Sequence, residues 1–210
     1  MSTKITDQLL NFVFDHAVRK DPRSVIDAID GYSQVNGGMI HLGMEKGAIF
    51  DQIVRRSGAS RVLELGTNYG YSAMRMALNL SDTATIHTIE VNQALADTAS
   101  AIITYAGLKD RIEVICGPAG QIIGGFSEPF DLVFIDHYPE NYFPDLQLIE
   151  QSGLLGDGAT VVTDNVVMFE SRLGAYLEHL RNGGNYHSAL HQPSSGSDGI
   201  EVSARLTRAA

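Results

Sequence analysis

The sequence predicts an α/β protein with a doubly wound, mostly parallel seven-stranded sheet, extra N-terminal helices and a C-terminal antiparallel hairpin. Short apolar runs alternate with segments of helical period through the middle of the chain, which is typical of βαβ units. The runs are continuously apolar, as in parallel strands that are covered on both faces. Near the C-terminus the pattern changes to alternating apolar and polar positions on either side of a polar turn, which predicts the hairpin.

Local patterns predict each element in turn. Asp21 can cap a helix that Pro22 opens, and a second helix ends at the turn formed by Ser57 and Gly58, so two helices precede the sheet. Parallel strands are expected at residues 61–66, 84–90, 111–117, 131–136 and 159–165. Helical period recurs at residues 95–106 and 173–180, and the hairpin strands are expected at residues 185–192 and 199–206.

Composition limits the classes of function. A chain of 210 residues with 44% hydrophobic content can bury one sizeable core, so a single domain over residues 1–210 is expected, with residues 1–20 as an N-terminal extension. The 15 basic and 25 acidic residues give a formal charge of −10. This charge argues against a nucleic-acid or anionic-membrane partner and favours a small molecule or a protein.

Three further features concern location and assembly. Cys116 is the only cysteine, which excludes an internal disulfide and a thiolate metal cluster and favours a reducing compartment. A signal-peptide core and a membrane-length apolar segment are both missing from the pattern, so a cytoplasmic location is expected. The N-terminal apolar stripe is expected to pack on its own domain, which leaves a monomer or a homodimer open; its members are Leu9, Leu10, Phe12 and Val13.

Two candidate ligand-binding features follow the first two strands, at the edge where such sheets bind ligands. In LELGTNYGYS, Gly66 and Gly70 permit a tight turn and close ligand approach, while Glu64 suits an amine better than a pyrophosphate. The G-x-G-x-x-G spacing is missing, which makes a nicotinamide reductase a weaker hypothesis. Glu90 lies where an acid binds ribose hydroxyls. Loop and acid together predict an adenosine-type ligand, with a plain turn and a helix-capping glutamate as the alternatives.

A candidate metal site lies at the ends of the fourth and fifth runs. Asp136 ends the fourth run, and Asp164 and Asn165 end the fifth. Because neighbouring parallel strands end at the same edge, these side chains are expected to converge. Two carboxylates and an amide oxygen form a hard oxygen site that prefers Mg²⁺, although each residue alone is also an ordinary turn residue.

In order along the chain, LELGTNYGYSAMRMA, IEVN, YAGLKDRIEVICG, FIDHYPENYFPD, TDNV and SDGIE resemble the catechol O-methyltransferase family. Its members are S-adenosylmethionine- and Mg²⁺-dependent enzymes that methylate one of two vicinal hydroxyls. The resemblance extends from about Asp21 to about Ser203. It implies a Rossmann-like methyltransferase fold with S-adenosyl-L-methionine and Mg²⁺ as cofactors.

The resemblance also implies roles for matching residues. Asp136, Asp164 and Asn165 match the Mg²⁺ ligands, and Glu201 matches the acid that binds the second substrate hydroxyl. The cofactor would be bound by Leu42, Glu64, Gly66, Asn68, Ser72, Glu90, Val91, Gly117, Ala119, Asp136 and His137. Ala119 and Gly120 replace polar residues that are usual in the adenine-side loop of the family.

Two departures from the family pattern concern the acceptor. Pro139 replaces a lysine that takes the proton of the reacting hydroxyl, and Gly38 replaces a tryptophan wall of the catechol pocket, with Phe169 on another side. A proline cannot transfer protons. Either another group accepts the proton or the acceptor needs less help. Among the possible groups, Glu201 and His137 rank ahead of Tyr138, and His41 is possible although it, His187 and His191 are better explained as surface histidines.

The sequence therefore predicts an S-adenosylmethionine- and Mg²⁺-dependent O-methyltransferase acting on a small bidentate oxygen acceptor, either a catechol or an acidic hydroxy-carbonyl compound. In-line methyl transfer to a metal-activated oxygen is the expected mechanism. Two alternatives stay open. A tRNA-modifying methyltransferase is disfavoured by the acidic chain, and a catalytically silent cofactor-binding homologue is suggested by Pro139.

Overall fold

The computed structural model describes residues 3–37, 42–196 and 198–207, and these residues build a seven-stranded sheet in the order β3-β2-β1-β4-β5-β7-β6. The strands are β1 (Arg61–Leu65), β2 (Thr85–Glu90), β3 (Ile112–Cys116), β4 (Phe130–Ile135), β5 (Leu155–Thr163), β6 (Tyr186–His191) and β7 (Ile200–Arg205). Strands β1 to β5 pair in parallel, whereas β7 is antiparallel to both of its neighbours, β5 and β6. The predicted parallel sheet with a closing hairpin is confirmed.

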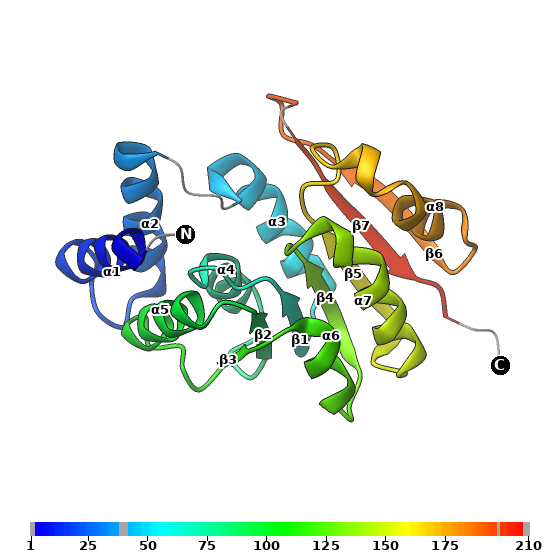
Figure 1. Ribbon diagram of the computed structural model, residues 1–210, viewed down its shortest axis with the longest axis horizontal. Helices are drawn as coiled ribbons and strands as arrows, with labels where there is room; N and C mark the ends of the chain where they lie inside the picture. The colour runs from blue at the N-terminus through cyan, green and yellow to red at the C-terminus, as the bar shows by residue number, and fades with distance from the viewer. Residues whose placement is uncertain (1–2, 38–41, 197, 208–210) are drawn as a thin grey trace.

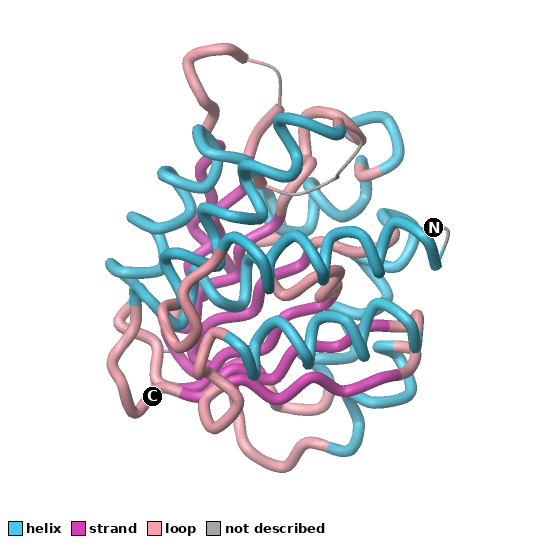
Figure 2. Tube along the Cα trace, turned by 90° about the vertical axis from the view of Figure 1, so that its left-hand side faces the viewer, coloured by secondary structure: helices cyan, strands magenta, loops and turns pink. Residues whose placement is uncertain are grey.

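Helices cover both faces of the sheet (Figure 1). They are α1 (Thr3–His16), α2 (Pro22–Asn36), α3 (Gly43–Ser57), α4 (Tyr71–Asn79), α5 (Gln93–Tyr105), α6 (Ala119–Ile122), α7 (Pro139–Gln151) and α8 (Gly174–Asn182), with two short 3-10 turns, η1 (Ile123–Gly125) and η2 (Glu170–Arg172). Figure 2 shows one of these helical layers in front of the strands. None of the described helices is long and apolar enough to cross a lipid bilayer.

The N-terminal helices differ in one respect from the prediction. The Asp21 carboxylate accepts hydrogen bonds from the N–H groups of Arg23 and Ser24, at 3.0 and 3.2 Å, and so caps α2 as expected. Helix α3 ends at Gly58, which adopts the left-handed conformation that favours glycine. The two helices predicted before the sheet, α2 and α3, are present, and a third helix, α1, precedes them. Leu9 and Val13 of α1 are fully buried, and this helix packs against α2 and α5 of its own chain.

Alternate side chains of the central strands enter two separate hydrophobic clusters. In β4, Leu132 and Phe134 join the cluster under α1 to α5, while Val133 and Ile135 join the cluster under α7 and α8. All four are fully buried. A strand that is covered on both faces must be apolar at every position, which explains the continuous runs in the sequence.

The register of the central strands aligns their carboxyl ends. Leu65 at the end of β1 pairs with Ile135 of β4, and Ile135 pairs with Thr163 of β5. The residues that follow these strands therefore emerge side by side at one edge of the sheet.

Candidate active site

A cavity of about 710 Å³ opens at this edge. Its volume lies in the range of small-molecule and cofactor sites. Most of the predicted site residues line it, namely Leu42, Gly66, Asn68, Ser72, Glu90, Val91, Gly117, Ala119, Asp136, His137, Tyr138 and Asn165. Three predicted residues do not line it, namely Glu64, Asp164 and Glu201.

The turn from β1 to α4 needs glycine where backbone segments meet. Gly66 has a φ of 102°, and a Cβ atom there would clash with the backbone carbonyl of Asp136 at the end of β4. The N–H of Gly66 donates to the carbonyl oxygen of Ile89 at 2.9 Å. Gly66 therefore lets the turn contact the ends of two neighbouring strands while its own backbone borders the cavity.

Glu64 lies beneath the cavity and does not reach it. Its side chain is fully buried, and its carboxylate accepts hydrogen bonds from the hydroxyls of Ser72 and Thr88. Burial raises the pKa of Glu64 to about 7, although both hydroxyl donors act in the opposite direction. The expected direct contact of Glu64 with the cofactor is thus not supported by the geometry, because Ser72 stands between the carboxyl and the cavity as a side chain that Glu64 orients.

Glu90 borders the cavity at the end of β2. One carboxylate oxygen accepts the N–H of Asn68 and the other accepts the N–H of Asn92, each at 2.9 Å. The side chain of Asn92, and not that of Glu90, caps α5. Glu90 consequently ties two cavity loops together, and its oxygens keep lone pairs for further donors such as ribose hydroxyls.

His137 is held by a carboxylate and an aromatic ring. Its Nε2 lies 2.8 Å from Oδ2 of Asp145, and its ring stacks on Tyr142 with a centroid distance of 5.3 Å. Its Nδ1 is buried and has no hydrogen-bond partner among the described residues. The imidazole is therefore fixed in orientation, with Nε2 bound to Asp145 and Nδ1 buried without a partner among the described residues.

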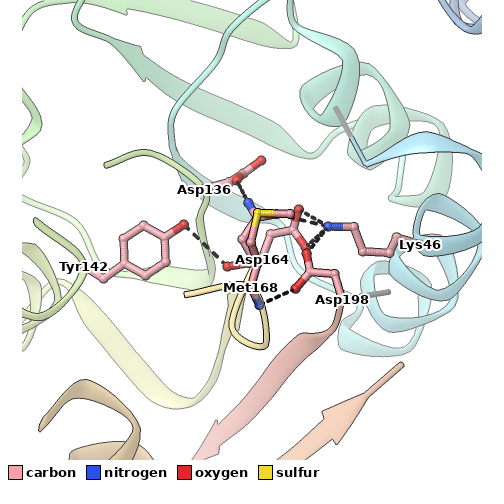
Figure 3. Close-up of polar contacts among 7 residues, drawn as sticks. Lys46, Asp136, Tyr142, Asp164, Met168 and Asp198 are labelled. Atoms are coloured by element: carbon pink, nitrogen blue, oxygen red, sulfur yellow. Dashed lines mark hydrogen bonds and ion pairs between the residues drawn. The ribbon is translucent and has the colours of Figure 1, made fainter. Parts of the chain in front are cut away.

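Two of the three predicted metal ligands, Asp136 and Asn165, line the cavity, and Asp164 lies next to them in the structure (Figure 3). Nδ2 of Asn165 donates to Oδ1 of Asp136 at 2.7 Å, and Asn165 has a φ of 61°, in a left-handed conformation that turns the chain after β5. Burial and the nearby Asp164 charge raise the pKa of Asp136 well above its ordinary value. Asp136 and Asn165, which follow the neighbouring strands β4 and β5, are therefore in contact.

Lys46 of α3 provides the positive charge at this cluster. Its Nζ lies 2.8 and 2.9 Å from the two carboxylate oxygens of Asp164, 3.2 Å from Oδ1 of Asn165 and 2.7 Å from Oδ2 of Asp198. Figure 3 shows the ammonium between Asp164 and Asp198. Burial lowers the pKa of Lys46, but the two carboxylates outweigh this effect and raise it above its ordinary value.

Sequence reasoning missed Lys46 and Asp198. Each lies in a segment that the family resemblance includes, Lys46 four positions after Leu42 and Asp198 three positions before Glu201. The signal available in the sequence was a lysine four positions after a predicted cofactor contact, Leu42. It carries little weight without coordinates, because more than a hundred residues separate Lys46 from Asp164 in the chain.

Carboxylate and amide oxygens are the donor types that a hard divalent cation prefers. Asp164 and Asn165 already direct oxygens at one cation, the ammonium of Lys46, and Asp136 lies in contact with Asn165. Within the described ranges, no group of three His, Cys, Asp or Glu side chains is placed to hold a metal. A Mg²⁺ ion at this position would therefore depend on the Asn165 amide and on water or acceptor oxygens, which is a coordination that Mg²⁺ accepts.

Glu201 is directed away from this cluster. Its carboxylate oxygens accept from Nε and Nη2 of Arg181 in α8, both at 2.8 Å, and its side chain is 1% exposed. In the sheet Glu201 pairs with Thr163 at the end of β5, but its carboxylate is bound by Arg181 of α8. The geometry does not support the expected contact of Glu201 with the acceptor.

Pro139 has a structural reason at its position. It begins α7, where the missing N–H of proline removes no helical hydrogen bond, and it lines the cavity. Tyr138, the residue before it, is 65% exposed and also lines the cavity. Gly38 and His41 lie outside the described residues. His187 and His191 are in β6 and are not among the cavity residues.

Comparisons with known proteins show the family to which the chain belongs. A family model described as O-methyltransferase matches residues 25–179. The chain is 37% identical to catechol O-methyltransferase B of Danio rerio over 208 residues, which cover 95% of this chain and 78% of that protein. It is 36% identical to catechol O-methyltransferase of Bos taurus, with 96% of this chain and 76% of that protein covered.

Solved structures support the fold. The O-methyltransferase from Bacillus cereus in complex with SAH has a TM-score of 0.73 at 23% identity, covering 97% of this chain and 100% of that chain. Cofactor-bound Rv0187 from MTB has a TM-score of 0.76 at 24% identity, covering 89% of this chain and 90% of that chain. The chain therefore belongs to the O-methyltransferase family, and the enzyme class expected from its sequence, an S-adenosylmethionine-dependent O-methyltransferase, is confirmed.

Proposed function

We propose that this chain transfers the methyl group of S-adenosylmethionine to one oxygen of a small bidentate oxygen acceptor, a catechol or an acidic hydroxy-carbonyl compound, with Mg²⁺ at the acid cluster. One observation carries the proposal. Asp136 and Asn165 line the cavity, and the oxygens of Asp164 and Asn165 converge on one positive charge, the ammonium of Lys46. The similarity to catechol O-methyltransferases of fish and cattle supports the same acceptor chemistry.

The cavity supplies a distinct environment for each part of the proposed cofactor. Ser72, held by Glu64, and the backbone of the Gly66 turn offer polar contacts for an amino-acid end. Glu90 offers carboxylate oxygens to two ribose hydroxyls. The remaining proposed contacts are Leu42, Asn68, Val91, Gly117, Ala119, Asp136 and His137.

The residues proposed for the metal are Asp136, Asp164 and Asn165. A divalent cation bound there supplies a Lewis acid that lowers the pKa of an acceptor hydroxyl. The ammonium of Lys46 has to share Asp164 with the ion or move toward Asp198, with which it forms its shortest ion pair at 2.7 Å. Asn165 donates to Asp136 through its amide nitrogen, and its amide oxygen, which accepts from Lys46 in this structure, is the atom that would bind the ion.

Among the candidate proton acceptors, the geometry favours His137. It lines the cavity, and Asp145 fixes its ring while Nδ1 stays uncommitted among the described residues. Glu201 is bound by Arg181, and Tyr138 is a largely exposed phenol. Pro139 contributes a wall of the cavity and no proton acceptor.

Methyl transfer to a panel of catechols and hydroxy-carbonyl compounds, with Mg²⁺ and again with EDTA, tests the proposal. We expect a methylated product, detected by mass spectrometry, only when the divalent ion is present. Asp164→Asn should lower turnover and weaken Mg²⁺ binding measured by calorimetry, because it removes a charge from the proposed ligand set. Turnover that chelation leaves unchanged would remove the metal from the mechanism.

The second candidate is a cofactor-binding homologue without catalytic activity. It is motivated by Pro139, by the capture of Glu201 by Arg181 and by the ammonium of Lys46 within the acid cluster. This alternative predicts calorimetric binding of S-adenosylmethionine with no product from any acceptor. The same panel therefore separates the two candidates.

A further inference from the structure

The segment after β5 joins the acid cluster to the outer part of the cavity. It begins at Asn165 and reaches Phe169 and Arg172, both of which line the cavity. The N–H of Phe169 donates to the carbonyl oxygen of Asn165 at 3.0 Å, and the N–H of Arg172 donates to that of Phe169 at 2.8 Å. These backbone bonds fix the backbone at Arg172 relative to the proposed metal ligand.

Arg172 is further positioned by its own side-chain contacts. The guanidinium lies over the ring of Phe169, with Cζ 5.1 Å from the ring centroid, and Nη2 forms an ion pair with Glu140 in the first turn of α7. Stacking and pairing hold a long side chain near one geometry and leave it 45% exposed. The guanidinium therefore remains accessible from the cavity.

Arg172 matters because the other charged residues that line the cavity are acidic. Arg172 is the only lysine or arginine among the described residues that line the cavity, and the acidic ones are Glu90, Asp136 and Asp145. These acids, in a chain of formal charge −10, oppose the entry of an anionic molecule unless a cation compensates. A guanidinium has five N–H donors, so pairing with Glu140 leaves donors for a second carboxylate.

We propose that Arg172 binds a carboxylate carried by the acceptor, so that the enzyme selects catechol acids over neutral or cationic catechols. The inference rests on the proposed function, because it assumes that the acceptor oxygens lie at the acid cluster. Phe169 then contacts the aromatic ring of the acceptor, and Arg172 contacts its carboxylate. Glu140 acts as an internal competitor that occupies part of the guanidinium until the acceptor arrives.

Matched acceptors and variants test this assignment. The acceptors are 3,4-dihydroxybenzoate, its methyl ester and a catechol with an aminoethyl chain. The variants are Arg172→Gln, Arg172→Lys and Glu140→Gln, with Glu170→Gln as a control that removes an exposed acid from the same 3-10 turn without touching the pair. The readouts are kcat and KM for each acceptor, and calorimetric binding of the acid and the ester to the protein loaded with S-adenosylhomocysteine.

The expected signs are opposite for the two partners. Relative to the ester, Arg172→Gln should weaken use and binding of the acid about five- to tenfold, and Arg172→Lys should restore part of that loss, because the broken pair is charge-assisted but partly exposed. Glu140→Gln should strengthen the preference for the acid, since the competitor is gone. Glu170→Gln should change the acid-to-ester ratio less than Glu140→Gln does.

Two results overturn the inference and differ from each other. If the wild-type protein methylates catechols but neither Arg172→Gln nor Glu140→Gln alters the acid-to-ester ratio, Arg172 does not read a carboxylate and the proposed function stands. If the wild-type protein binds S-adenosylmethionine but methylates none of the acceptors and binds none of them calorimetrically, the proposed function fails and the inference fails with it.

Discussion

Glu64 shows how a side chain outside the cavity can control one inside it. The carboxyl accepts from Ser72 and Thr88, and Thr88 lies 2.6 Å from the hydroxyl of Thr67, so four buried polar groups share one network. Burial raises the pKa of Glu64 to about 7 from an ordinary 4.5. Because the folded state favours the neutral form, its stabilising contribution is complete below about 4.5 and is lost as pH rises through about 7.

We therefore expect Glu64→Gln to flatten part of the pH dependence of stability. The amide mimics the neutral carboxyl and cannot ionise, so wild type should lose up to about 3 kcal/mol relative to the variant between the two pKa values. Urea unfolding in EDTA across pH 4 to pH 9, at roughly unit steps, measures this difference. Parallel curves for the two proteins would show that Glu64 keeps an ordinary pKa.

Lys46 is the charge on which the acid cluster depends in the absence of a metal. Its ammonium contacts Asp164 and Asp198, whose side chains are 3% and 5% exposed. Removing one partner of a buried ion pair leaves the other charges uncompensated.

Lys46→Met should destabilise the metal-free protein by about 3 kcal/mol, which lowers the melting temperature by about 5–10 °C. Added Mg²⁺ should recover more stability in the variant than in wild type, because no ammonium then competes for Asp164. Thermal unfolding in EDTA and in Mg²⁺ is the measurement, and Lys109→Met, at an exposed lysine, is the control. Equal Mg²⁺ effects in both proteins would argue against the proposed metal ligands.

The turn between β1 and α4 has no room for a side chain at Gly66. At Gly66 a methyl group would meet the Asp136 carbonyl, and the φ of 102° disfavours any L side chain.

Gly66→Ala should lower the affinity for S-adenosylmethionine by at least about tenfold and destabilise the fold by about 1–3 kcal/mol, because the turn must move away from β4. Calorimetry and thermal unfolding measure the two effects. Gly124→Ala is a matched control, since a methyl group there has nothing within 4 Å. Unchanged cofactor affinity in Gly66→Ala would mean that the turn does not border the cofactor.

The first residue of α7, Pro139, suits the start of a helix but cannot accept a proton. Position 139 is the first residue of the helix, where lysine is tolerated as well as proline because no backbone N–H is needed.

Pro139→Lys should raise kcat with a catechol acceptor by at least about tenfold, because it adds a proton acceptor to the cavity wall. Pro139→Ala removes the ring without adding an amine and should give no such gain. Initial rates at saturating S-adenosylmethionine compare the three proteins. A gain shared by both variants would point to loop mobility and not to proton transfer.

The protein as a whole is acidic. Its cavity is built from residues at the ends of most of its parallel strands. A ligand that bridges β1, β2, β3 and β4 binds only the folded chain, so it should stabilise the entire sheet.

At a hundredfold excess over its Kd, S-adenosylmethionine should add about 2.7 kcal/mol of stability, measured as an increase of about 5–10 °C in melting temperature.

The charge of −10 predicts no retention on tRNA at physiological salt. Salt-resistant retention on tRNA would revive the tRNA-modifying alternative.

Local sequence patterns were sufficient for the sheet and for the two helices directly before it. Strand and helix periods depend on residues close in sequence, and they predicted the parallel sheet and the hairpin correctly. The Asp21 cap and the helix end at Gly58 are equally local. Helix α1 was missed because its short apolar patch is interrupted by polar residues, and its burial depends on α5, about ninety residues later.

The candidate site divides in the same way. The residues at the strand ends could be found from sequence, because parallel strands place their carboxyl ends at one edge, and Asp136 and Asn165 do meet there. The direction in which each side chain points could not be found from the sequence. Glu64 lies under the turn, Glu201 pairs with Arg181, and Lys46 reaches Asp164 from a separate helix. These choices depend on which buried charges have partners within about 4 Å, and only the packed chain brings such partners together.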